Sequence, residues 1–225
     1  MWSYWQVCGP RNITTKYREL ISGPSGKSSL IATLLRVLDM DDDTGTIYID
    51  GLNIREISRE TIRERIITVP QEPFLFDGSV RRNAALSSTV SDDDIVQVLT
   101  RTGLWSILEE RGGLNADIRD QPLSQGQRQI FCLARAMLQK EKKILILDEA
   151  TSNLDHETDQ LMQTIVKENF ASHTVITVAH KLDTIGDSDK IAVLDSGSLV
   201  EFDSPSILLQ RDSAFKRLGG VLKSK

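Results

Sequence analysis

Three absences in this sequence narrow the possibilities. No apolar run approaches the roughly 20 residues that a membrane-spanning helix needs, so we expect no span within these residues. Two cysteines, Cys8 and Cys132, are too few for a disulfide framework and fit a reducing, cytosolic setting. There is no basic block, and the net charge of −5 argues against nucleic-acid binding through a large phosphate footprint. The aromatic start lacks the basic region and apolar core of a signal peptide.

The composition is that of a globular protein. Of the 225 residues, 40% are hydrophobic and 26% are charged. This length is enough for one sizeable α/β domain. The chain has no internal repeat, low-complexity tract or linker, so we expect a single domain over residues 1–225.

A glycine-containing loop precedes a strongly helical run, Leu30–Leu38. The loop reads Gly23-Pro24-Ser25-Gly26-Lys27-Ser28-Ser29 and looks like a phosphate-binding P-loop. In such a loop the backbone N–H groups surround the phosphates, Lys27 adds a positive charge, and the Ser28 hydroxyl reaches Mg²⁺. The alternative is a Gly/Ser turn before a helix, but further motifs follow at workable spacing and favour the phosphate loop.

This loop departs from the usual pattern G-x-x-x-x-G-K-[ST]. Ile21 occupies the position of the first glycine, and Gly23 lies only three residues before Gly26. Pro24 stands where a second glycine is common, and proline has no N–H to donate. We therefore expect the phosphate cradle to be short of at least one donor.

A glutamine follows a short buried strand. Ile66–Val69 reads as that strand, Pro70 stops it, and Gln71 comes next. Taken alone, Gln71 is explained equally well as a polar residue in an exposed loop. After it, residues 79–122 show two or three helical patterns, with an acidic start at residues 92–94.

The stretch Leu123-Ser124-Gln125-Gly126-Gln127 opens another helix. Ser124 is a suitable cap for a helix over Gln127–Leu138, and Gly126 would let a ligand approach the backbone. A helix start carries unpaired N–H groups and partial positive charge, so it can receive a phosphate. Taken alone, the stretch is explained equally well as a capped helix after a turn.

Two adjacent carboxylates end the next apolar run. Ile144–Leu147 is unbroken, as expected of a strand covered on both faces, and Asp148 and Glu149 follow it. The alternative is an ordinary acidic strand end. The position downstream of Lys27-Ser28 favours a catalytic pair.

Together these stretches resemble the ATP-binding cassette (ABC) ATPases. The P-loop, the signature motif at residues 123–127 and the Walker B strand at residues 144–149 occur in the family's order. The resemblance implies an α/β fold. Its parts would be a P-loop ATPase core with a mostly parallel sheet flanked by helices, a peripheral antiparallel β part, and an inserted helical subdomain at about residues 79–138, which includes the signature motif.

The resemblance also implies which residues hold the nucleotide and its metal. ATP would contact Gly23, Ser25, Gly26, Lys27, Ser28 and Ser29. Mg²⁺ would be held by Ser28, Gln71 and Asp148, the last through water. A second cassette would contact the same ATP through its own Ser124, Gln125, Gly126 and Gln127.

Three residues receive catalytic roles from the same resemblance. Glu149 would orient or deprotonate the attacking water, Gln71 would contact Mg²⁺ and that water, and His180 would contact the γ-phosphate. Asp155 ends a segment that resembles the D-loop, which acts across the dimer. A lone histidine is usually structural, so the role of His180 rests on its position after a strand.

The rest of the chain also follows an α/β pattern. We expect a helix over residues 158–170, a strand over 174–179, a hairpin formed by 191–195 and 198–202, and a closing helix over 205–218.

The resemblance covers about residues 20–218 and is strongest to the C-terminal cassette of the multidrug-resistance-associated subfamily. Residues 1–19 are atypical and show no clear periodicity. The family's first strands and its adenine-stacking aromatic residue are missing, although Tyr17, Trp5 or Tyr4 could substitute for that residue. These features suggest a truncated gene copy or a faulty gene prediction.

The leading hypothesis is an ATP-hydrolysing domain of an exporter, held at the cytoplasmic face of a membrane by transmembrane domains and paired with a second nucleotide-binding domain. An alternative is a non-hydrolytic binding or dimerisation fragment, because the P-loop and adenine side are incomplete. A chromosome-maintenance ATPase is a third, but such proteins insert long coiled coils before the signature, and the short insertion here has no heptads.

The incomplete loop generates a first prediction. Inserting the missing loop residues and replacing Pro24 by glycine should tighten Mg·ATP binding, because the cradle regains N–H donors. Calorimetric titration of both chains checks this. Tight binding by the native loop, unimproved by the repair, would contradict it.

Overall fold

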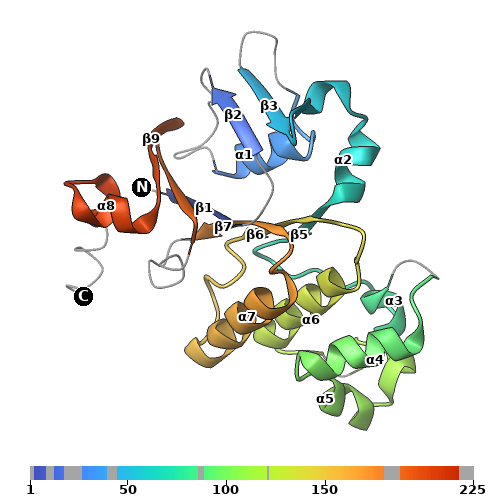
Figure 1. Cartoon of the computed structure of the whole chain (residues 1–225). Helices are drawn as coiled ribbons and strands as arrows, with labels where there is room; N and C mark the ends of the chain where they lie inside the picture. Colours follow the sequence, from blue (N-terminus) through green and yellow to red (C-terminus); the bar gives the residue numbers. More distant parts are fainter. Residues whose placement is uncertain are drawn as a thin grey trace. The chain divides into compact units, whose positions relative to one another are not determined.

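The computed structural model describes residues 3–8, 13–17, 27–39, 45–85, 89–120, 122–179 and 188–217. The chain forms two compact units, and each is described by itself. Unit 1 comprises residues 1–67, 142–149 and 172–225, and unit 2 comprises residues 68–141 and 150–171. Figure 1 shows the helices and strands of both.

A six-stranded sheet forms the centre of unit 1. Its strand order is β5-β6-β7-β1-β8-β9. The strands are β1 (Ser3–Cys8), β5 (Ile66–Val69), β6 (Ile144–Asp148), β7 (Thr174–Ala179), β8 (Lys190–Asp195) and β9 (Ser198–Asp203). β6 and β7 are parallel, with Asp148 opposite Val178. β1 lies between β7 and β8 and is antiparallel to both, so the sheet is mixed.

The presence of β1, and of β2 (Ile13–Tyr17), corrects the sequence analysis, which found no clear periodicity in residues 1–19 and took the family's first strands to be missing. The segment Ser3–Cys8 mixes polar, aromatic and aliphatic residues and gives no clean alternation. Its backbone pairs along both edges, with Gln6 opposite Thr177 on one side and Ile191 on the other. Strand formation here is decided by the neighbouring strands rather than by local propensity.

A smaller antiparallel sheet also belongs to unit 1. It contains β2 (Ile13–Tyr17), β3 (Gly45–Ile49) and β4 (Leu52–Asn53), in that order. The turn between β3 and β4 is Asp50-Gly51, with φ values of 52° and 80°. Positive φ at both residues is what a two-residue type I′ hairpin turn requires, and Asp-Gly is a preferred dipeptide for it.

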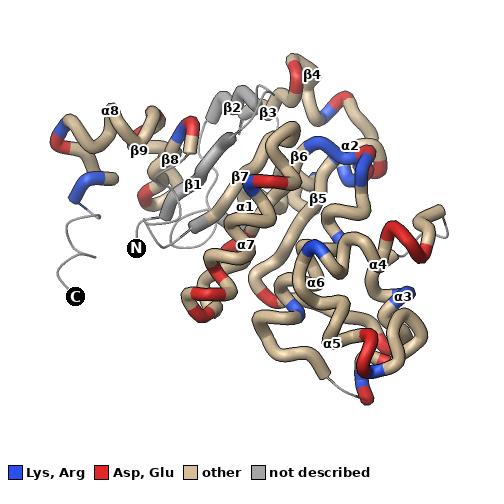
Figure 2. Tube along the Cα trace, turned by 60° about the horizontal axis from the view of Figure 1, so that its bottom comes forward, with Lys and Arg blue, Asp and Glu red and all other residues tan. Residues whose placement is uncertain are grey.

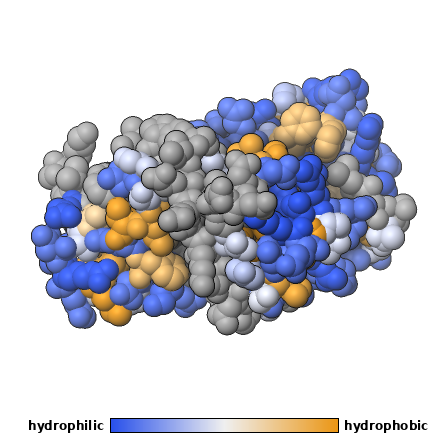
Figure 3. Space-filling view, turned by 90° about the horizontal axis from the view of Figure 1, so that it is seen from above, coloured by the Kyte–Doolittle hydropathy of each residue, from blue (hydrophilic) through white to orange (hydrophobic). Residues whose placement is uncertain are grey.

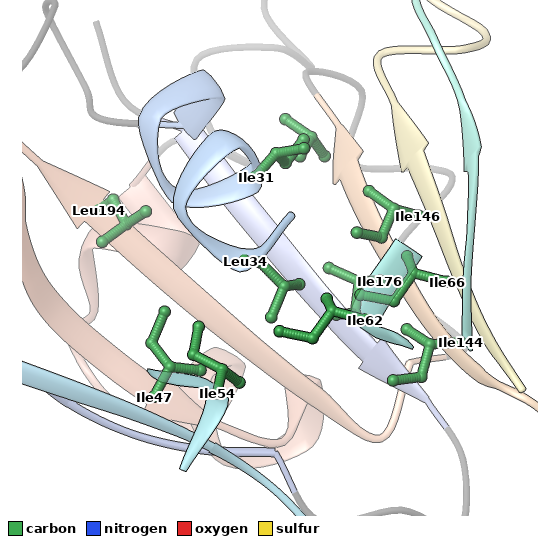
Figure 4. Close-up of a cluster of buried hydrophobic side chains, with 11 residues drawn as sticks. Ile31, Leu34, Ile47, Ile54, Ile62, Ile66, Ile144, Ile146, Ile176 and Leu194 are labelled. Atoms are coloured by element: carbon green, nitrogen blue, oxygen red, sulfur yellow. The ribbon is translucent and has the colours of Figure 1, made fainter. Parts of the chain in front are cut away.

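The core of unit 1 lies around helix α1 (Lys27–Leu34). Ile31 and Leu34 of α1 pack against side chains from both sheets, as Figure 4 shows. The other members are Ile47, Ile54, Ile62, Ile66, Ile144, Ile146, Ile176, Val178 and Leu194. Ile54 lies on the short 3₁₀ helix η1 (Ile54–Glu56), and Ile62 lies on α2 (Arg59–Arg65).

The helix expected over Leu30–Leu38 is too long, because α1 ends at Leu34. Arg36 has φ of 50°, outside the helical region, and its guanidinium donates to the carbonyl of Ile57 over 2.6 Å. Val37 and Leu38 are 63% and 46% exposed, so they have little apolar surface to pack against. The helix therefore ends where its buried face ends.

Unit 2 is a set of helices around α6. Its elements are α3 (Val80–Ala84), α4 (Asp92–Arg101), α5 (Trp105–Glu110), the 3₁₀ helix η2 (Gly113–Asn115), α6 (Gln125–Met137) and α7 (His156–Asn169). α6 contacts α3, α4 and α7. The acidic start expected at residues 92–94 is the first turn of α4, capped by Ser91, and appears red in Figure 2.

The closing helix expected over residues 205–218 is interrupted. α8 spans only Pro205–Gln210, Arg211 is extended, and a second helical turn begins at Ala214. The Glu201 carboxylate accepts the N–H groups of Ala214 and Phe215 over 2.7 and 3.1 Å, and Ser213 accepts the N–H of Lys216 over 2.9 Å. These side chains satisfy a new helix start, which breaks the continuous helix.

The edge of the six-stranded sheet carries exposed apolar side chains. Leu199, Val200 and Phe202 of β9 and Ile207 and Leu209 of α8 are 44–52% exposed. Figure 3 shows hydrophobic atoms at the end of unit 1 that contains these elements. β9 pairs on one side with β8 and ends the described sheet on the other.

The core generates a prediction about stability. Ile146 is fully buried in β6, so Ile146→Ala should destabilise the protein by about 2–5 kcal/mol through lost burial and a cavity. Ile207 is 45% exposed, and Ile207→Ala should change stability by no more than about 0.5 kcal/mol. Urea unfolding of both variants checks this, and equal losses would contradict it.

Candidate functional site

The carboxylate pair expected after the apolar run lies at the end of a buried parallel strand. Leu145 and Ile146 of β6 are 0% exposed, and Asp148 is half-buried at the carboxyl end. Ligands of open α/β sheets bind outside the carboxyl ends of the strands. Asp148 therefore lies where such a fold places a ligand-binding carboxylate.

Glu149 has an unusual backbone conformation. Its φ is 49°, in the left-handed region that residues with a side chain rarely adopt. Its N–H donates to the carbonyl of Val178 over 3.1 Å, which continues the β6–β7 pairing by one residue. The chain therefore turns sharply at Glu149 while the residue stays tied to the sheet. Conformations of this kind cost about 1–3 kcal/mol and cluster at functional sites.

The phosphate-loop residues are only partly described. Lys27 and Ser28, which belong to the expected P-loop, open α1. Ser29 is 8% exposed, and its carbonyl accepts the hydroxyl of Thr33 over 2.7 Å. Gly23, Ser25, Gly26 and His180 lie outside the described residues.

The cap expected at Ser124 is confirmed. The Ser124 hydroxyl accepts the N–H of Gln127 over 3.2 Å, and the Gln127 side chain accepts the N–H of Ser124 over 2.9 Å. This reciprocal pair is a capping box. α6 begins at Gln125, two residues earlier than expected. Ser124 and Gln125 are exposed, so this helix start is open to a ligand.

Gly126 lies close to a neighbour on α7. A Cβ added to Gly126 would lie 3.2 Å from Cγ2 and 3.3 Å from Oγ1 of Thr158. Thr158 is fixed in turn, because its N–H and hydroxyl donate to the two carboxylate oxygens of Asp155 over 2.9 and 2.7 Å. The glycine of the signature thus packs directly against the residue that Asp155 holds.

Asp155 caps α7, which runs from His156 rather than from Thr158 as expected. The hydrogen bonds from Thr158 hold the pKa of Asp155 below its ordinary value. Because this pKa is lowered in the folded state, the cap is at full strength above the ordinary carboxyl range and weakens as the pH falls through the lowered value.

Gln71 is exposed. The segment that follows it is held within unit 2 by hydrogen bonds to its main chain. Asn83 accepts the N–H of Phe76 over 2.7 Å and donates to its carbonyl over 2.9 Å. Arg135 of α6 donates to the carbonyls of Asn83 and Phe74 over 2.7 and 3.2 Å.

Arg135 is a half-buried cation. Its guanidinium carbon lies 5.8 Å from the ring centre of Phe76 and 6.0 Å from that of Phe131. Burial lowers the pKa of Arg135 from its ordinary value. Sequence analysis did not identify Asn83 or Arg135, because their roles depend on the main-chain carbonyls of Phe76 and Phe74, which are 7 and 61 residues away.

Comparison with known proteins now identifies the family. The sequence model described as ABC transporter matches residues 20–152, which include the P-loop, Gln71, the signature and Asp148-Glu149. The chain belongs to the ABC transporter family. Asp155 and His180 lie beyond the matched residues.

Full-length ABC transporters resemble this chain over most of its length. ABC multidrug transporter B of Aspergillus fumigatus is 47% identical over 94% of the chain, and ATP-binding cassette sub-family C member 2 of Rattus norvegicus is 44% identical over 85%. The chain spans only 15% and 12% of the length of these relatives. The expected likeness to the multidrug-resistance-associated subfamily is thus confirmed.

The fold has a solved counterpart. The structure of a bacterial Atm1-family ABC exporter with ATP bound matches 99% of the chain and 42% of that protein, with a TM-score of 0.81 and 27% identity. The expected α/β fold of a P-loop ATPase is therefore confirmed. None of the helices in the described part of the chain is long and apolar enough to cross a membrane.

The residues of this ABC chain fit a magnesium ion of the kind that accompanies a nucleotide. Among the described residues, no group of three or more acidic, histidine or cysteine side chains forms a metal cluster. Mg²⁺ at nucleotide sites uses one or two carboxylates together with phosphates and water, rather than a full protein cage. Asp148, half-buried at a strand end, meets that smaller requirement.

The contact between Gly126 and Thr158 generates a prediction. Gly126→Ala should destabilise the chain by about 1 kcal/mol, because Thr158 is fixed by Asp155 and cannot easily move away. In a Thr158→Ala background the same change should no longer destabilise, because the crowding atoms are gone. Urea unfolding of the four chains checks this, and an equal cost in both backgrounds would contradict it.

Proposed function

We propose that this chain is the ATP-binding and ATP-hydrolysing domain of a membrane exporter, in which ATP hydrolysis drives transport. The observation that supports this most strongly is Glu149, a carboxylate held in a strained left-handed conformation directly after Asp148 at the end of β6. Strained backbone conformations of this kind cluster at functional sites.

The nucleotide would occupy the start of α1 and the end of β6. Its phosphates would be held by backbone and side-chain groups of Gly23, Ser25, Gly26, Lys27, Ser28 and Ser29. Ser28, Asp148 and Gln71 would hold Mg²⁺, which neutralises phosphate charge when it is bound. The missing loop donors would weaken this binding without removing the charge of Lys27.

Catalysis would depend on positioning and charge. Glu149 would orient or deprotonate the attacking water, Gln71 would hold that water near the metal, and His180 would contact the terminal phosphate. Lys27 would neutralise charge that develops as the terminal bond breaks.

A second nucleotide-binding domain would complete the site. The open start of α6 is suited to a phosphate, since its cap uses the helix's own side chains and leaves the end exposed. Ser124, Gln125, Gly126 and Gln127 of one cassette would contact ATP bound to the other, and Asp155 would act across the pair. ATP would join the cassettes, and hydrolysis would release them.

The names of the relatives indicate the kind of protein in which this cassette would act. The A. fumigatus relative is named a multidrug transporter, and the structural counterpart is an exporter. By analogy, transmembrane domains would hold this cassette at the cytoplasmic face of a membrane, and no nucleic acid would be involved.

A non-hydrolytic role is the second candidate, and it is favoured by Ile21 and Pro24 in the P-loop. A fragment of this kind would bind nucleotide weakly and pair with a complete cassette. It predicts no turnover by the purified chain, alone or with such a partner.

The test of hydrolysis is Glu149→Gln. Glutamine keeps the shape of glutamate but is not a base, so turnover should fall by about 10²- to 10⁴-fold. ATP-dependent pairing should persist, because the phosphate contacts remain. Phosphate release and light scattering measure the two effects, with Glu110→Gln on the exposed surface of α5 as the matched control. Turnover that survives Glu149→Gln would show that Glu149 has a different role.

A further inference from the structure

A buried glutamine of α6 reaches the residue before Gln71. The side-chain nitrogen Nε2 of Gln129 donates to the carbonyl of Pro70 over 2.8 Å, across 59 residues of sequence. The Gln129 side chain is 1% exposed, so the donor of this bond is buried within unit 2, while Pro70 itself is exposed. The main chain is thus fixed at the point where the loop with Gln71 begins.

Other residues of α6 hold the far end of the same loop. Arg135 donates to the Phe74 carbonyl over 3.2 Å, and the Phe74 main chain also contacts the Cys132 thiol. Gln129, Cys132 and Arg135 are spaced by three residues and therefore lie on one side of the helix. Of these three, Gln129 is the one that contacts the residue next to Gln71.

Stability does not explain a glutamine at this position. The other amide atom, Oε1, is buried and has no hydrogen-bond partner among the residues that the structure describes. An unpaired buried oxygen is unfavourable, and an apolar side chain of the same length would fill the space without it. What glutamine adds is the donor that holds the Pro70 carbonyl.

We propose that Gln129 is a positioning residue for Gln71. By tying Pro70 to α6, it fixes the start of the Gln71 loop relative to Ser124, which caps the same helix. The end of α6 that would receive a partner's ATP and the loop that would reach the chain's own Mg²⁺ therefore share one rigid support. This inference rests on the proposed function, in which Gln71 contacts the metal and the attacking water.

The first arm of the test measures how firmly Gln129 holds the start of the Gln71 loop, and it does not depend on ATP hydrolysis. Gln129→Met removes the donor and also the unpaired oxygen, so the fold should be retained. Backbone NMR order parameters of Gln71 and Glu72 should fall toward those of a flexible loop, below about 0.6. Those of α6 and Phe76 should not change, because Asn83 still holds Phe76. Gln97→Met, an exposed glutamine of α4, is the matched control.

The second arm measures hydrolysis. Loss of one hydrogen bond should lower kcat about three- to tenfold, with KM for ATP changed by less than about twofold. Gln71→Ala should remove this effect: if Gln129 acts through Gln71, adding Gln129→Met to Gln71→Ala lowers kcat no further. A structural role would instead lower kcat by the same factor in both backgrounds.

The outcomes separate this inference from the proposed function. Unchanged order parameters at Gln71 and Glu72, or additive losses of kcat, would overturn the role of Gln129. Absence of turnover by the native chain would overturn the proposed function, while the order parameters still decide whether Gln129 holds the loop. If Gln129→Met does not fold, Gln129→Asn serves the same measurements, because its amide is one methylene too short to reach Pro70.

Discussion

The start of helix α6 must be stabilised while it stays open to solvent, and the positions of the neighbouring loops depend on this helix. The reciprocal bonds between Ser124 and Gln127 satisfy two of the backbone N–H groups at this start without help from another element. The rest of the helix is anchored by buried side chains such as Phe131 and Leu133, both 0% exposed. A rigid, deeply packed helix therefore presents an unobstructed positive end.

The same helix fixes the loops around it. Gly126 lies against Thr158, which is held by Asp155, and Gln129 holds the carbonyl of Pro70 before Gln71. The start of α6 and the segments at Asp155 and Gln71, to all of which the resemblance assigns a role at the nucleotide site, thus share one support through close packing and a main-chain bond. A displacement of α6 would have to move all three, because packed interiors transmit small shifts rather than absorb them.

Two features of the structure are energetically unfavourable by themselves. Glu149 adopts a left-handed backbone, and Gln129 buries an oxygen that has no partner in the described part of the chain. Neither feature helps the fold, and both lie within or next to the residues that would handle nucleotide. Strain and unpaired polar atoms that persist in a folded protein are expected where function requires them. The buried cluster around α1 provides the stability that tolerates them.

The sequence by itself determined the family, the buried strand ending in Asp148 and the cap at Ser124, because these depend on residue type at short, fixed spacing. It misjudged β1 and the ends of α1 and α8, where strand pairing, exposure and the capping groups of Ser213 and Glu201 decide the outcome. It could not reveal the bond from Gln129 to Pro70, since every residue has a main-chain carbonyl and the residue type does not show which carbonyl accepts the bond. Only the tertiary structure brings such distant groups within hydrogen-bonding distance.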